Sequence, residues 1–188
     1  MHSTKTTRRE RPGKVRIIAG EYRGRRLAVP DRPGLRPTGD RVRETLFNWL
    51  GQRLDGCTCL DLFAGTGALG FEAASRGAAR VVMVENDRVA YEALRQAKAL
   101  LPAPRVELIF DEALRYLEFG DERFDLVFLD PPFRQNALAA TLERLPPRLA
   151  DAGRVYVEAA EPVAPGEGWR ELRRARAGQV SYQLLEKR

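Results

Sequence analysis

The stretch "CLDLFAGTGALGFEA", residues 59–73, decides the fold class of this chain. An apolar run leads into three glycines with the spacing G-x-G-x-x-G, at Gly65, Gly67 and Gly70. A turn of this kind between a buried strand and a helix brings backbone amides close to a nucleotide-like ligand. Because dinucleotides and other nucleosides both use such a turn, the glycines alone indicate the ligand class only coarsely.

Apolar segments and helical patterns alternate along the chain from residue 57 onward. Segments that are apolar throughout are typical of strands buried on both faces, and their alternation with helices predicts right-handed βαβ units in a parallel sheet. The last two segments, 169–177 and 179–187, have no helix between them and predict an antiparallel hairpin at one sheet edge. We therefore expect a Rossmann-like α/β fold with further strands at 57–63, 80–85, 105–110, 124–130 and 153–160, and helices at 68–76, 87–101, 112–118 and 136–149.

The chain before residue 57 has a different pattern. Residues 15–30, VRIIAGEYRGRRLAVP, contain two short β-prone runs around a glycine-bounded turn and predict a hairpin. A helix is expected next, with Thr38 or Asp40 as its cap and its end at about Leu54. This organisation divides the chain into a disordered basic tail (1–14), a β-hairpin extension (15–37) and an α/β domain (38–188).

Basic residues are concentrated near the N-terminus. Residues 1–43 hold 13 Lys and Arg against four Asp and Glu, whereas the rest of the chain holds 19 against 22. A basic arm on a mildly acidic body is typical of a protein that binds a polyanion, although a solvated tail explains the first few arginines equally well. The arginines that continue into patterned sequence, and that we expect to contact nucleic acid, are Arg16, Arg23, Arg25, Arg26, Arg36, Arg41 and Arg43.

Composition excludes several classes of protein. No apolar run reaches roughly 18 residues, and the N-terminus has no apolar segment of a secretory signal, so we expect a cytoplasmic protein without a membrane span. Cys57 and Cys59 are predicted to be small core residues in a reducing compartment. The only histidine, His2, lies in the tail, which argues against a histidine-based metal site or a Ser-His-Asp triad. We expect no metal.

Acidic residues follow the predicted strands. Asp61 lies just before the glycine turn, and a carboxylate beside a pyrophosphate would be unfavourable. S-adenosylmethionine carries an ammonium and a sulfonium and no phosphate, so Asp61 favours that ligand, although an aspartate can also serve as a plain turn residue. Glu85 ends the next strand and is placed to accept the ribose hydroxyls of any nucleoside.

A third acidic position follows the strand at 105–110. Asp111 or Glu112 is placed to reach an adenine amino group, and the sequence leaves the choice between them open. Asp111 is equally suited to be the cap of the helix at 112–118.

The sequence Asp130-Pro131-Pro132-Phe133 ends the strand at 124–130 and is the most specific stretch of the chain. The Asp130 carboxylate and the Pro131 carbonyl are two acceptors suited to the exocyclic amine of a planar base, and Phe133 is suited to stack on that base. Two such hydrogen bonds would aim the nitrogen lone pair at a methyl donor, with Asp130 accepting the proton that the nitrogen loses. The alternative is a rigid structural turn.

These motifs resemble those of a known superfamily. The segment D-L-F-A-G-T-G (61–67) is similar to the first motif of class I S-adenosylmethionine-dependent amino-methyltransferases, and D-P-P-F is similar to their (N/D)-P-P-(Y/F/W) motif. Together with residues 16–50, the following Arg134 and the ending AGQVSYQL (177–184), they resemble the bacterial 16S ribosomal RNA guanine-N2 methyltransferases of the RsmD type. The resemblance covers nearly the whole chain from Arg16.

The resemblance implies a seven-stranded sheet with a C-terminal antiparallel hairpin and an N-terminal β-hairpin extension. It also implies methyl transfer from S-adenosylmethionine to a guanine N2 of 16S rRNA, within an assembling 30S subunit, by a monomer. The cofactor residues would be Asp61, Phe63, Gly65, Gly67 and Glu85, with Asp111 and Glu112 both kept as candidates because Glu112 departs from the family's Asp or Asn.

The same resemblance implies the substrate site. Asp130, Pro131 and Phe133 would carry the reaction on the target guanine. The alternative for Arg36 and Arg41 is that they are salt-bridge partners of helices in the core. The residues expected at the RNA are Arg16, Arg23, Arg25, Arg26, Arg36, Thr38, Arg41, Arg43, Pro132 and Arg134.

Three other functions remain open at this point. Adenine-N6 methylation of DNA or RNA uses the same chemistry, because both bases present an exocyclic amine. A nicotinamide oxidoreductase shares the glycine turn, but Asp61 and the D-P-P-F loop argue against it. A non-catalytic RNA-binding assembly factor would not need Asp130.

Overall fold

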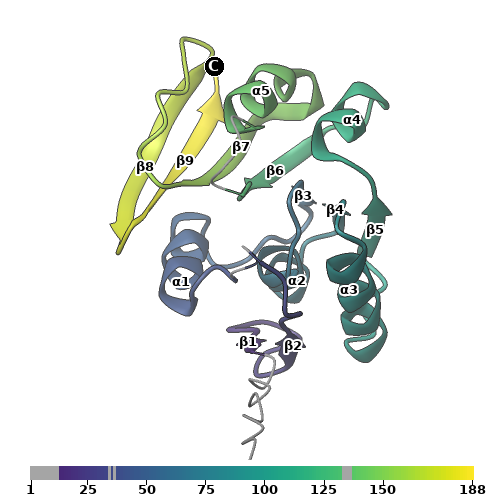
Figure 1. Cartoon of the computed structure of the whole chain (residues 1–188). Coiled ribbons are helices and arrows are strands. Elements are labelled where there is room, and N and C mark those ends of the chain that lie inside the picture. The colour runs from purple at the N-terminus through teal and green to yellow at the C-terminus, as the bar shows by residue number, and fades with distance from the viewer. Residues whose placement is uncertain (1–12, 34, 36, 133–136) are drawn as a thin grey trace, which may run out of the picture.

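A seven-stranded sheet runs through the centre of the computed structural model, which describes residues 13–33, 35, 37–132 and 137–188 (Figure 1). The strand order is β5-β4-β3-β6-β7-β9-β8, and β9 runs in the direction opposite to the other six strands. This confirms the predicted Rossmann-like sheet and its C-terminal hairpin. The strands are β3 (Thr58–Asp61), β4 (Arg80–Glu85), β5 (Val106–Phe110), β6 (Phe124–Leu129), β7 (Leu149–Ala159), β8 (Trp169–Ala177) and β9 (Val180–Lys187).

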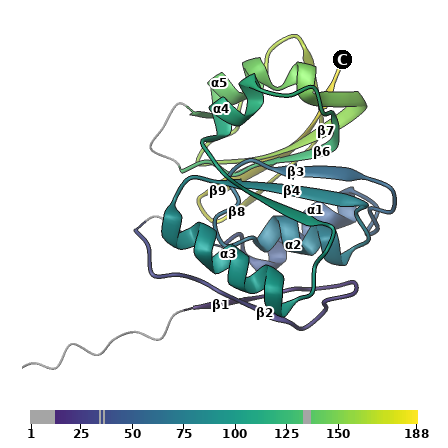
Figure 2. The ribbon, with the colours of Figure 1, turned by 90° about the vertical axis from the view of Figure 1, so that its right-hand side faces the viewer.

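Helices cover both faces of this sheet, because its strands are apolar on both sides. Figure 2 shows α1, α2 and α3 on one face and α4 and α5 on the other. Each face has its own hydrophobic cluster, the first centred on residues such as Phe47 and Phe128 and the second on residues such as Leu60 and Val127. The helices are α1 (Asp40–Trp49), α2 (Ala68–Ser75), α3 (Arg88–Leu100), α4 (Ala113–Glu118) and α5 (Ala137–Arg144). None of the helices in the described part of the chain is long and apolar enough to cross a membrane.

The N-terminal hairpin consists of β1 (Lys14–Arg16) and β2 (Arg26–Ala28), paired antiparallel. Its inward side chains, Val15 and Leu27, are buried in the same hydrophobic cluster as α1 and α2. Figure 2 shows the hairpin lying beneath the layer of α2 and α3. The predicted hairpin is therefore present, but it is packed into the core of the α/β unit and is not a separate arm.

Several predicted boundaries were wrong, for local reasons. Helix α1 begins after Gly39, whose position carries no side-chain cap bond, so neither Thr38 nor Asp40 is the cap. The helix ends at Trp49 rather than near Leu54, because Gly51 and the residue after it adopt positive φ. The helix predicted at 136–149 ends at Arg144, because consecutive prolines begin the 3-10 turn η1 (Pro146–Arg148). Strand β7, predicted to begin at residue 153, begins at Leu149, directly after that turn.

The sheet changes direction between β3 and β6. The chain first runs outward from β3 through β4 to β5 and then crosses back to β6 on the other side of β3. In open parallel sheets ligands bind beyond the carboxyl ends of the strands at such a point. The fold therefore places the ligand site where β3 and β6 end.

Candidate functional site

Three carboxylate residues lie at the carboxyl ends of neighbouring strands. Asp61 is opposite Phe128 in the register of β3 and β6, and Leu129 is opposite Val157 in the register of β6 and β7. Asp130 and Glu158 therefore follow at the same level, one residue further along their strands. Side chains two residues apart share a face of a sheet, so Asp61, Asp130 and Glu158 lie on the face that α1 and α2 cover.

Asp61 is 1% exposed and lacks one hydrogen-bond partner. Its Oδ2 accepts a hydrogen bond of 3.1 Å from the amide of Gly70, whereas its Oδ1 is buried without a partner among the described residues. Burial is the main cause that raises the pKa of Asp61 to about 7, with smaller contributions from the nearby carboxylates of Glu85 and Glu158, although the hydrogen bond from the Gly70 amide lowers it. A buried acceptor with no donor fits a ligand that brings a positive charge and N–H groups.

The glycine turn is held next to this carboxylate. Gly65 and Gly67 both have positive φ, and a Cβ on Gly67 would lie 2.6 Å from the ring of Phe71. The carboxylate of Glu85, at the end of β4, accepts hydrogen bonds from the amides of Gly65 (2.8 Å) and Asp87 (2.7 Å). Each carboxylate oxygen retains a further lone pair, so Glu85 fits the ribose hydroxyls while it orders the turn.

The third glycine of the pattern has a different role. A Cβ on Gly70 would lie 2.7 Å from the sulfur of Met83 on β4, so this position brings α2 close to the sheet. Its amide is also the donor to Asp61.

Asp130 lies beside Thr38 from the segment before α1. The Thr38 hydroxyl donates to Asp130 Oδ2 over 3.4 Å, and Thr38 is itself buried. Burial raises the pKa of Asp130 well above its ordinary value, and the carboxylates of Glu158 and Asp61 raise it further. Pro131 is buried and Pro132 is exposed. The predicted site residues Phe133 and Arg134 lie outside the described residues.

Glu158 is a site residue that the sequence reasoning missed. It is 5% exposed, and its Oε1 accepts a hydrogen bond of 2.8 Å from the hydroxyl of Tyr156. Burial raises its pKa, and the hydroxyls of Tyr156 and Thr38 oppose that shift. The available signal was weak, because Glu158 lies within the predicted strand at 153–160, two residues before its end, whereas Asp130 ends its own predicted strand.

The remaining candidate cofactor residues lie nearby without decisive contacts. Phe63 follows β3 and packs against the second hydrophobic cluster. Asp111 accepts a hydrogen bond from the amide of Glu112 (2.9 Å) and faces Arg115. Glu112 occupies the start of α4 and makes no side-chain cap bond there. The predicted adenine contact of Asp111 or Glu112 therefore stays a prediction.

Arg43 does not have the exposed position that an RNA contact requires. Its side chain is 0% exposed, and its guanidinium donates to Glu72 (3.1 Å), Asp40 (2.6 Å) and the carbonyl oxygens of Thr38 and Arg16. Because a buried guanidinium requires such a complete set of acceptors, Arg43 is a structural residue here. The expectation that it contacts RNA was wrong.

Glu72 on α2 is the other half of this buried network. Its carboxylate accepts from Arg43, from Arg76 Nε (2.8 Å) and from the amides of Ile18 (2.8 Å) and Ala19 (3.0 Å). These bonds join α1, α2 and the hairpin. They anchor the segment that precedes α1, and with it Thr38, beside the strand ends.

The exposed arginines of the hairpin fall into two groups. Arg16 and Arg26 are directly opposite one another on its outward face, and Arg16 forms an ion pair with Asp40. Arg23 and Arg25 lie in the turn, where Arg25 donates to the Leu100 carbonyl at the end of α3.

The end of α3 is at the amino ends of the parallel strands, opposite the carboxylates, so the structure separates Arg23 and Arg25 from the site. Arg41 is exposed on α1, and Arg36 lies outside the described residues.

The connection from the hairpin to α1 runs past the glycine turn. A Cβ on Gly65 would lie 2.9 Å from a methyl group of Leu35. Arg32 forms an ion pair with Asp87, the N-cap of α3. The basic N-terminal region therefore borders the predicted cofactor loop through this connection.

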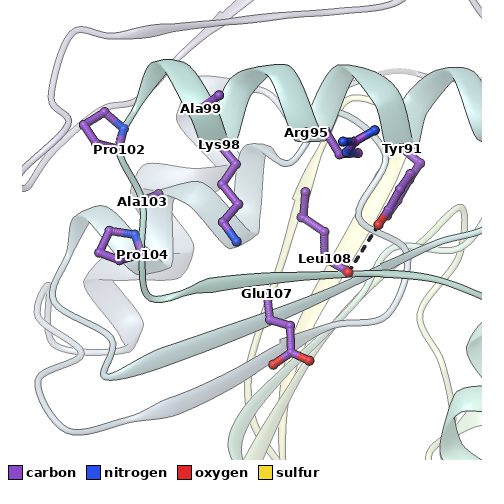
Figure 3. A pocket seen from close by; sticks show the side chains of 9 residues that line it. All are labelled: Tyr91, Arg95, Lys98, Ala99, Pro102, Ala103, Pro104, Glu107 and Leu108. Carbon is purple, nitrogen blue, oxygen red and sulfur yellow. Dashed lines mark hydrogen bonds between the residues drawn. The ribbon is translucent and has the colours of Figure 1, made fainter.

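A hollow of about 670 Å³ lies elsewhere, on the outer side of α3 and β5 (Figure 3). The Tyr91 hydroxyl donates to the Leu108 carbonyl at its edge over 3.4 Å. Because it continues to the loop between α3 and β5, it leads away from the carboxylates at the strand ends. Its lining residues are Tyr91, Arg95, Lys98, Ala99, Pro102, Ala103, Pro104, Glu107 and Leu108.

In the part of the chain that the structure describes, no group of three His, Cys, Asp or Glu side chains is arranged to hold a metal ion. Cys57 and Cys59 are both free thiols, and burial raises the pKa of each. The carboxylates at the strand ends instead fit the cationic, donor-rich groups of S-adenosylmethionine.

The sheet order, the glycine turn and the acidic strand ends together define the class I methyltransferase fold. Superposition on solved structures agrees with this assignment. The solved structure of yhhF from Escherichia coli, described as a methyltransferase, superposes with a TM-score of 0.84 at 43% identity, covering 93% of this chain and 98% of that one. The structure of SMU.776 complexed with SAH superposes with a TM-score of 0.73 at 17% identity, covering 94% and 57%, and supports the fold alone.

Residues 15–186 match the family model described as Conserved hypothetical protein 95, so the chain belongs to that family. It is 44% identical over 181 residues to "Ribosomal RNA small subunit methyltransferase D" of Escherichia coli (strain K12), covering 93% of this chain and 91% of the relative. The protein of the same name from Haemophilus influenzae is 42% identical over 182 residues, with coverages of 93% and 94%. These findings confirm the family resemblance expected from the motifs.

Proposed function

We propose that this protein transfers a methyl group from S-adenosylmethionine to the exocyclic N2 of a guanine in 16S ribosomal RNA. The observation that carries the proposal is the meeting of Asp61 and Asp130 at the switch point of the sheet, one carboxylate for a cationic cofactor and one for an amine. Relatives of nearly the same length that are named ribosomal RNA small subunit methyltransferases support RNA as the substrate class.

Each cofactor residue binds a different part of S-adenosylmethionine in this proposal. Asp61 accepts from its amino group through the free Oδ1, Glu85 accepts from the ribose hydroxyls, and Gly65 and Gly67 allow the backbone to approach. S-adenosylmethionine, when bound, supplies an activated methyl group. Its positive charge also compensates the buried carboxylates, for which the described residues provide no ion pair with lysine or arginine.

Asp130 and the Pro131 carbonyl hold the target amine. Both accept hydrogen bonds from the N–H groups of the exocyclic nitrogen. These hydrogen bonds reduce the delocalisation of the nitrogen lone pair into the ring and direct that lone pair outward. When the nitrogen gains a methyl group it loses one proton, and Asp130 is placed to take it. Phe133 is proposed to stack on the base.

The exposed basic residues of the hairpin and of the connection to α1 supply the RNA contacts in this proposal. Arg16 and Arg26 lie opposite each other on the outward side of the hairpin, where their like charges are offset in part by the exposed Arg16–Asp40 ion pair and would be offset further by a phosphate. A base within structured RNA must also be flipped out to reach the D-P-P-F loop, at a cost of a few kcal/mol. Phosphate contacts offset that cost and make binding sensitive to salt.

The test is the Asp130→Ala protein. The substrate is small ribosomal subunits purified from cells that lack this protein. On these subunits we expect the Asp130→Ala protein to show near-complete loss of methyl transfer, while it still binds S-adenosylmethionine. Asp151→Ala, a change at an exposed aspartate, is the matched control and should leave transfer unchanged. Retained turnover in the Asp130→Ala protein would refute the role assigned to this residue.

A further inference from the structure

Glu158 is a buried carboxylate that the proposed reaction does not use. It follows Val157, which is opposite Leu129 in the β6–β7 register, so its backbone is adjacent to that of Asp130. The Asp130 pKa is raised by the Glu158 carboxylate, which places the two acids within electrostatic contact. Two acceptors therefore lie side by side where the target base is proposed to enter.

The groups around Glu158 are acidic or neutral. Asp61 and Asp130 face it from β3 and β6, and Tyr182 is its partner on β9. The Tyr156 hydroxyl donates to its carboxylate, and the nearby Thr38 hydroxyl donates to Asp130. Within the described ranges, no lysine or arginine forms an ion pair with these three acids. The unpartnered Oδ1 of Asp61 independently indicates that donors are to come from ligands.

We propose that Glu158 is the residue that selects guanine, by accepting a hydrogen bond from N1–H beside the amine held by Asp130. This inference rests on the proposed function. Guanine presents N1–H and the 2-amino group next to each other, so its edge offers adjacent donors to two adjacent carboxylates. Adenine presents an acceptor, N1, next to its 6-amino group. With the cationic cofactor bound, which favours the ionised form of Glu158, that acceptor would face a carboxylate and leave it unpaired.

The contacts of Glu158 are suited to this role. The Tyr156 hydroxyl fixes Oε1 at 2.8 Å, and Tyr156 is in turn packed against Phe128, with ring centroids 6.4 Å apart. A carboxylate whose position is already fixed by this hydrogen bond loses little conformational entropy when it binds a base.

The test uses the Glu158→Gln protein, because the amide is isosteric and its oxygen can still accept from Tyr156. It replaces one acceptor oxygen by an NH₂ donor, which opposes N1–H. We expect kcat/KM on small subunits to fall by about tenfold or more, with the Kd for S-adenosylmethionine within about twofold of wild type. Glu161→Gln, at an exposed glutamate, is the control and should behave as wild type.

A second substrate separates base recognition from a structural role. After the methylated guanine has been mapped, subunits are reconstituted with 2-aminopurine at that position, which keeps the 2-amino group and lacks N1–H. For the wild-type enzyme, kcat/KM should be about tenfold or more lower on 2-aminopurine than on guanine. For the Glu158→Gln enzyme the difference should be much smaller, because the contact between residue 158 and N1–H is already absent.

Equal losses in the two enzymes, or wild-type activity of Glu158→Gln on guanine, would overturn the assignment. A wild-type enzyme that transfers no methyl to any guanine amine would instead refute the proposed function itself.

Discussion

Replacing Asp61 with asparagine should stabilise the ligand-free protein at alkaline pH and weaken cofactor binding at the same time. The variant keeps an oxygen for the Gly70 amide and removes the charge. Burial raises the pKa of Asp61 from 3.8 to about 7. A shift of about three units corresponds to roughly 4 kcal/mol of unfavourable ionisation in the folded state.

The sign of the pH dependence follows from this shift. Between about pH 4 and pH 7 the folded protein holds the Asp61 proton more tightly than the unfolded chain does, so ionisation of Asp61 lowers the free energy of unfolding as pH rises. The asparagine side chain of the variant has no such proton. The difference in stability should therefore be near zero at pH 4 and should favour the variant by up to about 4 kcal/mol at pH 8.

Two assays measure these effects. Urea unfolding of the ligand-free proteins at pH 4, 6 and 8 gives the stability difference, with Asp151→Asn as the exposed control. Calorimetric titration with S-adenosylmethionine at pH 8 should give a Kd about 10- to 100-fold weaker for the variant, because a charge-assisted hydrogen bond to the ligand is lost. An Asp61→Asn protein that is less stable than wild type at pH 8, or that binds the cofactor equally well, would refute the reasoning.

Three further changes test the framework of the site. Glu72→Ala removes the carboxylate that the buried guanidinium groups of Arg43 and Arg76 share and should lower the free energy of unfolding by about 3–5 kcal/mol in urea denaturation. Gly20→Ala would place a Cβ 1.8 Å from the Ser75 carbonyl oxygen. Gly24 has a similar φ, but a Cβ there would meet open space, so Gly24→Ala is the matched control. Gly20→Ala should therefore increase the hydrogen-exchange rates of the hairpin amides far more than Gly24→Ala does. Arg26→Ala should leave cofactor affinity unchanged and reduce the slope of log K against log salt for RNA binding by about 1; an unchanged slope would place RNA elsewhere.

The sheet could be predicted from the sequence because its information is local. Buried parallel strands are apolar runs, and five of the seven strands follow one another with a helix between them, so the apolar run at 80–85 located β4 at its observed bounds. The bounds of β8 were predicted from Gly178, which separates it from β9 without a helix. Strand ends could then be compared with one another. That comparison predicts from the sequence alone that Asp61 and Asp130 lie at one edge of the sheet.

The roles of single charged residues were harder to predict, because they depend on contacts between distant segments. Arg43 looked like part of a basic arm, yet the helical spacing that it shares with Leu46, Phe47 and Leu50 was a signal that it points toward the core. Its acceptors come from three separate parts of the chain, and sequence periodicity does not reveal them. Glu158 was missed for a similar reason, since its importance depends on the β6–β7 register.

The hairpin illustrates the same limit. Its two strands were predicted correctly, but their composition suggested a detachable RNA-binding arm. The structure buries Val15 and Leu27 in the main core and ties the turn to Ser75. Removal of residues 15–35 would therefore disturb the fold as well as RNA binding, and single changes at exposed arginines are the better probes.

Identification of the methylated product is the decisive test of guanine-N2 methylation by this protein. Small ribosomal subunits from cells without this protein are incubated with the purified enzyme and isotopically labelled S-adenosylmethionine, and the RNA is digested and mapped by mass spectrometry. We expect label in N2-methylguanosine at one position of 16S rRNA. Label in N6-methyladenosine, or no label in RNA, would contradict it.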